Sequence, residues 1–318
     1  MGFQPDFTWI KDRTNAYGHD LYDVIRGTTK RLQTNDTGAE GTASTGLTSF
    51  DSDGFTLGSY AGDNTNTANY ASWNWLASNT TASNTDGSIT STVSANTTSG
   101  FSIVSYSGGG SFGDTVGHGL GSVPAMIIVK CTSASSDWYI WQKNMGANDN
   151  QFMAFNDSAL QTSGATIFDV SAMSSTTFTL GTNIDVNGSG RTFVAYCFAE
   201  VKGFSKFGSY RGNEQIGNSA PFIYTGFKPA WLMVKKYSAA NHWIIWDNKR
   251  STKNGFNIID RKLYANLSNI ENGADDVSFL SNGFKFNTNT GDWNELQDYI
   301  YMAFAEEPLV GDNPATAR

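Results

Sequence analysis

The strongest constraint on this chain is a threefold internal repeat with a pitch of roughly 105 to 119 residues. Each copy opens with a short apolar strand that begins at Pro and ends at Lys six residues later. These strands run from Pro5 to Lys11, from Pro124 to Lys130 and from Pro229 to Lys235. A His or Trp stands fourteen residues beyond each Pro and an aromatic residue stands seventeen beyond. These positions hold His19, Trp138 and Trp243, and then Tyr22, Trp141 and Trp246. The constant spacing predicts three copies of one folding unit.

Two further strands follow in each copy at a fixed distance. The second strand begins at Phe55, Phe178 and Phe284, and the third begins fifteen residues later at Tyr70, Phe193 and Tyr299. Asp-Gly or Asn-Gly pairs at 53–54, 187–188 and 282–283 are typical of tight hairpin turns. An extra strand, 101–106 or 204–210, precedes the second and third copies, and the first copy lacks it.

These patterns predict an all-β chain. Ser, Thr and Asn are abundant, and they compete with the helix backbone for hydrogen bonds. Aromatic residues make up 14% of the chain, which is too many for a disordered protein. We expect three tandem antiparallel β-sandwich repeats, jelly-roll-like, over residues 1–98, 99–202 and 203–318. The stretch 77–100, dominated by Ser, Thr and Asn, is either a connector of the first repeat or a strand.

The missing first strand leaves one sheet edge of the first repeat without a partner. An open edge presents unpaired backbone groups and invites pairing with another segment. The sequence offers three candidates to cover it: the stretch 77–100, a neighbouring subunit, or a larger parent protein.

Charge and hydropathy exclude several classes of function. The net charge is −8 and the sequence pI is about 4.8, so a nucleic-acid partner and an anionic membrane surface are disfavoured. The sequence shows neither a long apolar run nor a secretory signal pattern, so we expect no membrane insertion. Cys131 and Cys197 lie in apolar strand-like segments, and two free thiols are favoured over a disulfide.

The residues that usually carry catalysis are scattered. His19, His118 and His242 have no metal-ligand spacing around them, so no metal and no cofactor is expected. The segment 51–54, Asp-Ser-Asp-Gly, resembles the start of a calcium loop but lacks the later Glu and is better explained as a hairpin turn.

A pair of carboxylates would be the minimum for glycoside cleavage. Asp23 and Asp247 occupy equivalent positions in the first and third copies, but Gln142 stands there in the second. A base follows each Asp closely, at Arg26 and at Arg250, so a structural Asp–Arg pair is the favoured interpretation.

The candidate binding residues are four tryptophans in two pairs. Trp138 with Trp141, and Trp243 with Trp246, are each separated by three residues, so in a strand the two side chains point to opposite faces. One member of each pair could lie outward and stack on a sugar or fill a partner's pocket. Core packing of both members is the alternative.

Several motifs, in order, resemble one known family. They are Gly2 to Lys11, Phe50 to Gly58, Val116 to Pro124 and Tyr299 to Glu306. They are similar to a repeat found in structural proteins of tailed bacteriophages, especially marine and cyanobacterial phages, which are commonly parts of tail fibres or other host-contacting appendages. The resemblance spans essentially the whole chain and implies no catalytic residues.

The resemblance implies a non-enzymatic virion protein, made in the host cytoplasm and placed in an external appendage. Its expected partners are other virion proteins and a glycan or protein of the host surface, and the expected assembly is a homo-oligomer, with a trimer favoured. The alternatives are a capsid decoration or head-fibre protein and, from another class, a polysaccharide depolymerase.

Overall fold

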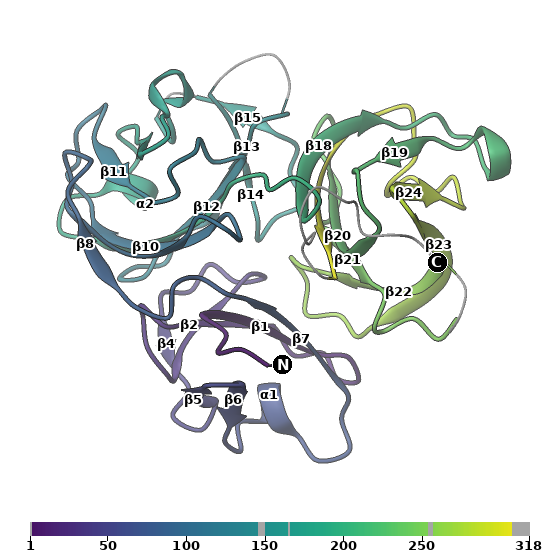
Figure 1. Cartoon of the computed structure of the whole chain (residues 1–318), viewed down its shortest axis with the longest axis horizontal. Helices are drawn as coiled ribbons and strands as arrows, with labels where there is room; N and C mark the ends of the chain where they lie inside the picture. The colour runs from purple at the N-terminus through teal and green to yellow at the C-terminus, as the bar shows by residue number, and fades with distance from the viewer. Residues whose placement is uncertain (1, 146–149, 165, 254–256, 307–318) are drawn as a thin grey trace.

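The computed structural model describes residues 2–145, 150–164, 166–253 and 257–306. Strands are the main regular structure of these residues, the helices are short, and every pair of named strands is antiparallel. The all-β, antiparallel prediction is confirmed. Three large sheets form three lobes around a common centre, with the first lobe at the bottom of Figure 1, the second at the upper left and the third at the right.

The first lobe, which holds the first repeat, contains a five-stranded sheet in the order β4-β3-β2-β1-β7. Its strands are β1 (Phe7–Asp12), β2 (His19–Asp23), β3 (Lys30–Gln33), β4 (Gly41–Thr42) and β7 (Tyr70–Trp75). The hairpin of β5 (Leu47–Asp51) and β6 (Gly54–Leu57) and the short helix α1 (Ala61–Asn64) lie on its outer side (Figure 1).

The second lobe contains an eight-stranded sheet in the order β15-β14-β13-β12-β17-β10-β9-β8. Its strands are β8 (Ala82–Asn84), β9 (Ser91–Asn96), β10 (Phe101–Ser107), β12 (Met126–Cys131), β13 (Trp138–Gln142), β14 (Gln151–Ala154), β15 (Thr162–Ser163) and β17 (Thr192–Phe198). The pair of β11 (Thr115–Gly117) and β16 (Thr177–Thr179), the 3₁₀ turn Val170–Ala172 and helix α2 (Ile184–Asn187) complete this lobe.

The third lobe contains another eight-stranded sheet, in the order β18-β25-β20-β21-β22-β23-β24-β19. Its strands are β18 (Ser205–Arg211), β19 (Phe222–Tyr224), β20 (Pro229–Lys236), β21 (Ile244–Asp247), β22 (Ile258–Tyr264), β23 (Asn272–Leu280), β24 (Gly283–Phe286) and β25 (Asp298–Ala305). A 3₁₀ turn at Gly217–Ser219 precedes β19.

The repeat spacing corresponds to equivalent strands. The Lys-ending strands are β1, β12 and β20, and the third strands of the repeat are β7, β17 and β25. Each third strand pairs with the Lys-ending strand of its own lobe. The backbone N–H fourteen residues beyond each Pro donates to an Asn side chain in all three lobes. These bonds are His19 to Asn35 (2.8 Å), Trp138 to Asn156 (2.8 Å) and Trp243 to Asn266 (3.0 Å).

The stretch 77–100 belongs to the second sheet. It forms β8 and β9, and β9 pairs with β10 over six residues, Asn96 with Phe101 through Ser91 with Tyr106. The expected boundary at residue 98 therefore falls inside one sheet. Neither strand pairs with β7, so this stretch does not fill the open edge of the first lobe.

The three sheets share one apolar core. A single cluster of buried side chains includes Trp9 and Trp75 of the first lobe, Tyr196 of the second, and Trp231 and Met302 of the third. The outer faces of the first and third sheets cover smaller cores of their own, around Tyr22 and Phe284. Each central sheet is therefore buried on both faces, one inside its own lobe and one at the common centre.

Candidate functional site

The structure buries all four predicted binding tryptophans. Their exposed fractions are 0% for Trp138, 7% for Trp141, 1% for Trp243 and 0% for Trp246. Trp243 lies in the shared core and Trp246 in the core of the third lobe, so the two do point to opposite faces of β21. The hypothesis that one member of each pair faces solvent is wrong and the alternative, core packing of both members, is confirmed, because both faces of these sheets are covered.

Two of these tryptophans join neighbouring lobes. The Trp138 indole N–H donates to the carbonyl oxygen of Gln33 in the first lobe at 2.9 Å, and the Trp243 indole N–H donates to that of Ala154 in the second lobe at 3.1 Å. His19 takes the equivalent place in the first lobe, where its Nδ1 accepts from the Trp9 indole N–H at 2.8 Å. Complete burial lowers the pKa of His19 well below its ordinary value, so the ring is neutral and able to accept.

The Lys that ends the first strand of each repeat is buried and crosses to the adjacent lobe. Each ammonium group donates to backbone carbonyls of its own lobe and to one carbonyl of another. The bonds between lobes run from Lys11 to Ser268 (3.3 Å), from Lys130 to Thr37 (3.0 Å) and from Lys235 to Ser158 (3.1 Å). The first lobe thus contacts the third, the second contacts the first and the third contacts the second, all in one rotational sense.

Asp23 and Asp247 form structural ion pairs, as expected. Each carboxylate accepts from the Nε of an Arg three residues later at 2.5 Å, and Arg26 and Arg250 are themselves almost fully buried. Each Asp also accepts a bond from the next lobe. The Tyr196 hydroxyl donates to Asp23 at 2.7 Å, and the Trp73 indole N–H donates to Asp247 at 3.0 Å.

We call each interface between two lobes a seam. At the seam between the second and third lobes, Gln142 replaces the Asp and donates to the carbonyl oxygen of Gly208 at 3.3 Å. Met302 occupies the position of Tyr196 and Trp73. These polar groups are bound to one another within the seams and are not free for catalysis.

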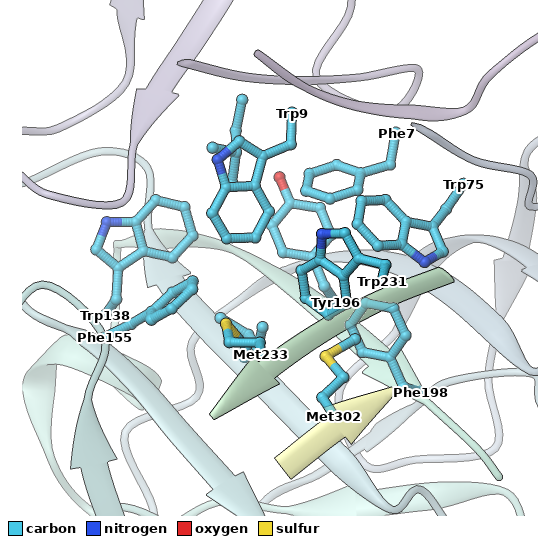
Figure 2. A pocket seen from close by; sticks show the side chains of 12 residues that line it. Phe7, Trp9, Trp75, Trp138, Phe155, Tyr196, Phe198, Trp231, Met233 and Met302 are labelled. Atoms are coloured by element: carbon cyan, nitrogen blue, oxygen red, sulfur yellow. The ribbon is translucent and has the colours of Figure 1, made fainter. Parts of the chain in front are cut away.

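A small cavity lies where the lobes meet. Figure 2 shows side chains of all three lobes turned toward one another around it, among them Trp9, Tyr196, Trp231 and Met233. Its volume is about 10 Å³ and its walls are apolar. A space of this size holds at most one water molecule and offers it no polar partner, so the cavity is not a ligand site.

One carboxyl pair was not anticipated from the sequence. Asp20 and Asp63 are each 1% exposed, and their carboxyl groups interact with each other. The Tyr22 hydroxyl donates to Asp63 at 2.6 Å, and Arg31 pairs with Asp20 at 3.2 Å. Burial and the neighbouring carboxylate raise the pKa of Asp20 well above its ordinary value. The pair resembles the acid of a hydrolase in chemistry, but neither carboxyl is accessible to a substrate.

The described residues also offer no site for metal or thiol chemistry. Among the described residues, no three His, Cys, Asp or Glu side chains are grouped to hold a metal ion. Cys131 and Cys197 are free and fully buried, as the sequence favoured, and burial raises the pKa of Cys197 above its ordinary value. A buried, protonated thiol is a poor nucleophile.

The large apolar side chains that do reach solvent include a group at one edge of the third lobe. On edge strand β19, Phe222 and Tyr224 are 46% and 63% exposed while Ile223 between them is buried. Ile216, just before β19, is 58% exposed. Figure 1 shows β19 away from the common centre of the three lobes. In the sequence, the alternation Phe-Ile-Tyr marks these residues, but three residues are too few to distinguish an exposed edge strand from a strand of the core.

Comparisons with known proteins give a family without a function. A family model described as a domain of unknown function, DUF7483, matches residues 1–308, and the chain therefore belongs to that family. No curated protein and no solved structure matches the chain. Of the helices within the described ranges, none has the length and apolar character needed to cross a bilayer.

Proposed function

We propose that this member of the DUF7483 family is a non-enzymatic structural protein of a tailed-phage virion, placed in a tail fibre or another appendage that contacts the host surface. The proposal includes assembly as a homo-oligomer, with a trimer favoured, and attachment to other virion proteins. It also treats the three lobes as copies of one sandwich-like repeat related to the jelly roll. The sequence resemblance described above supplies the virion setting.

The observation that carries a binding rather than a catalytic role is the distribution of side chains. The groups that could perform chemistry, including His19, Cys197 and the Asp20–Asp63 pair, are buried away from solvent. Phe222 and Tyr224 instead present aromatic surface to solvent on an edge strand. Exposed aromatic side chains are typical anchors for sugars and protein partners. A rigid β-protein with such an anchor suits attachment.

The test is staining of host cells with the purified, fluorescently labelled chain. A panel of marine bacteria and cyanobacteria is incubated with the wild type and with the double variant Phe222→Ser, Tyr224→Ser. Phe112→Ser is the matched control, because Phe112 is a comparably exposed aromatic (56%) in the second lobe. We expect the wild type and the control to stain at least one strain and the double variant to lose most of the signal. Light scattering on the same samples measures the oligomeric state.

Other results would favour the alternatives. Binding to assembled capsids, with no staining of any cell, would replace the appendage by a capsid decoration or head-fibre protein. Release of sugar from host polysaccharide would contradict the non-enzymatic proposal and favour a depolymerase.

A further inference from the structure

The open edge of β7 can be compared with two covered copies of itself. In the second lobe β17 pairs with β12 on one side and with β10 on the other, and in the third lobe β25 pairs with β20 and β18. In the first lobe β7 pairs with β1 alone, within the part of the chain that the structure describes. The chain itself therefore shows twice what occupies this edge.

Backbone geometry determines which groups of β7 are free. The Arg13 N–H donates to the carbonyl oxygen of Asn69 at 2.8 Å, which makes 13 and 69 a hydrogen-bonded pair of the β1–β7 ladder. Odd residues of β7 therefore direct their backbone groups to β1, and even residues direct theirs to the open side. Ser72 is exposed and Asn74 is half-buried, and their N–H and carbonyl groups face the unpaired edge.

The seam beside this edge matches one that already holds an added strand. Between the second and first lobes, Tyr196 bonds to Asp23 while β10 lies along β17. Between the first and third lobes, Trp73 bonds to Asp247 in the equivalent arrangement. The same seam geometry leaves the same place for a strand beside β7.

The two covered copies also indicate the chemistry of that strand. The residue opposite the position of Trp73 is large and apolar in both, Ile103 in β10 and Phe207 in β18. Two residues later both strands carry Ser, at 105 and 209. The other face of β7 carries Ser72 and Asn74 where the equivalent strands are buried, so the added strand can be polar on that side.

We propose that the open edge of β7 is a strand-addition site that binds a seven-residue strand of a separate polypeptide, antiparallel, with a large apolar residue opposite Trp73 and polar residues on the outer face. Main-chain hydrogen bonds from Ser72 and Asn74 supply the affinity, and the apolar position supplies the selectivity. This inference does not depend on the virion proposal.

The experiment uses the unmodified protein and a peptide with the sequence of β18, Ser-Lys-Phe-Gly-Ser-Tyr-Arg, labelled at its N-terminus. In its native place this strand directs the backbone groups of its even residues to β25, because Gly212 N–H donates to Gln297 at 3.0 Å in the same ladder. Two modified peptides follow from this. One is N-methylated at the glycine equivalent to Gly208, whose N–H would face β7, and the other at the serine equivalent to Ser209, whose N–H would face away.

We expect saturable binding of the unmodified peptide by fluorescence anisotropy. Methylation at the glycine should weaken binding by about tenfold or more, the effect of one lost hydrogen bond, and methylation at the serine should have little effect. Hydrogen exchange should slow at Ser72 and Asn74. Absence of saturable binding, equal binding of both methylated peptides, or protection confined to another sheet edge would each overturn the proposal.

Discussion

Replacing Phe198 by Ala tests whether the three lobes, which close into a ring around their common centre, fold as one cooperative unit. Phe198 is 3% exposed and lies at the common centre, where it meets the equivalent residues of the other two third strands. Its ring centroid is 6.3 Å from that of Trp75 and 6.1 Å from that of Phe304, and Trp75 and Phe304 are 5.7 Å apart. One side chain from each lobe therefore completes this triangle.

The expected loss follows from the size of the buried ring. Truncation of a buried Phe to Ala costs about 3–5 kcal/mol of unfolding free energy. With an unfolding entropy of about 2.1 cal/mol/K per residue over 318 residues, a loss of about 4 kcal/mol lowers Tm by roughly 6 °C. Differential scanning calorimetry should show a single transition that moves as a whole, because removing this contact weakens all three lobes together.

Phe279→Ala is the matched comparison. Phe279 is fully buried in the separate core of the third lobe, so its truncation removes a similar ring away from the centre. If the lobes form one cooperative ring, both variants lower the same transition. A thermogram in which Phe198→Ala shifts only one of several components, while Phe279→Ala shifts a different one, would refute the cooperative ring.

Three further outcomes follow from buried titratable groups. Burial lowers the pKa of Lys235 to about 7, so between pH 7 and pH 10.5 the unfolded chain binds more protons than the native chain. The free energy of unfolding therefore rises with pH in this window. Lys235→Met should remove a slope of about 1.4 kcal/mol per pH unit from urea titrations at pH 8 to 10. The pair of Asp20 and Asp63 retains its proton above the ordinary Asp pKa of 3.8, so its contribution is complete below that value and is lost as pH rises through the raised pKa. Asp20→Asn removes the carboxyl whose pKa is raised well above its ordinary value, so it should flatten this acid-side slope, also by about 1.4 kcal/mol per unit, and a wild-type slope in the variant would contradict the raised pKa. Native protein should not react with a thiol reagent at Cys131 or Cys197 until denaturant is added, and rapid labelling of either would show that its burial is wrong.

Local sequence pattern was sufficient to predict the repeated strands. The apolar run from Pro124 to Lys130 and the fixed spacing of Phe178 and Phe193 identified β12, β16 and β17, because strand patterning and turn residues act over short distances. The same reasoning identified the missing strand of the first lobe. It did not assign the stretch 77–100, whose polar residues fit a loop and a solvated edge hairpin equally well.

The error over the tryptophans has a different origin. Period-two reasoning assigns one face of a strand to the core and the other to solvent, and Trp243 and Trp246 do point to opposite faces. Solvent is excluded from the second face only because three lobes close around a centre. That closure depends on contacts between residues 66 to 258 positions apart, which no local pattern records.

The buried lysines carried a signal that was available in the sequence. Lys stands at the same position of all three repeats, in a chain with few basic residues, directly after an apolar run. We interpreted it as a strand end, although a residue type held at three equivalent positions also fits a shared structural role. Asp20 and Asp63 had no such signal, because they are 43 residues apart and occur as a pair in the first lobe alone.

The seam between the first and third lobes carries contacts beyond those of the shared plan. Arg13 holds Glu271 with two bonds of 2.9 and 2.7 Å. The backbone bond beside this pair, from the Glu271 N–H to the carbonyl oxygen of Arg13, belongs to the shared plan, because Glu40 to Thr132 and Gln161 to Tyr237 repeat it in the other seams. Arg250 also pairs with Glu271, at 2.8 Å, so two cations converge on one carboxylate.

Chain connectivity gives a physical reason for an additional ion pair at the seam between the first and third lobes. The first and second lobes, and the second and third, are joined by short peptide links that keep each pair close together. The first and third lobes have no direct link, so closing their seam must overcome the entropy of a loop that spans the whole second lobe. The Arg13–Glu271 pair therefore stabilises the seam that no direct peptide link holds.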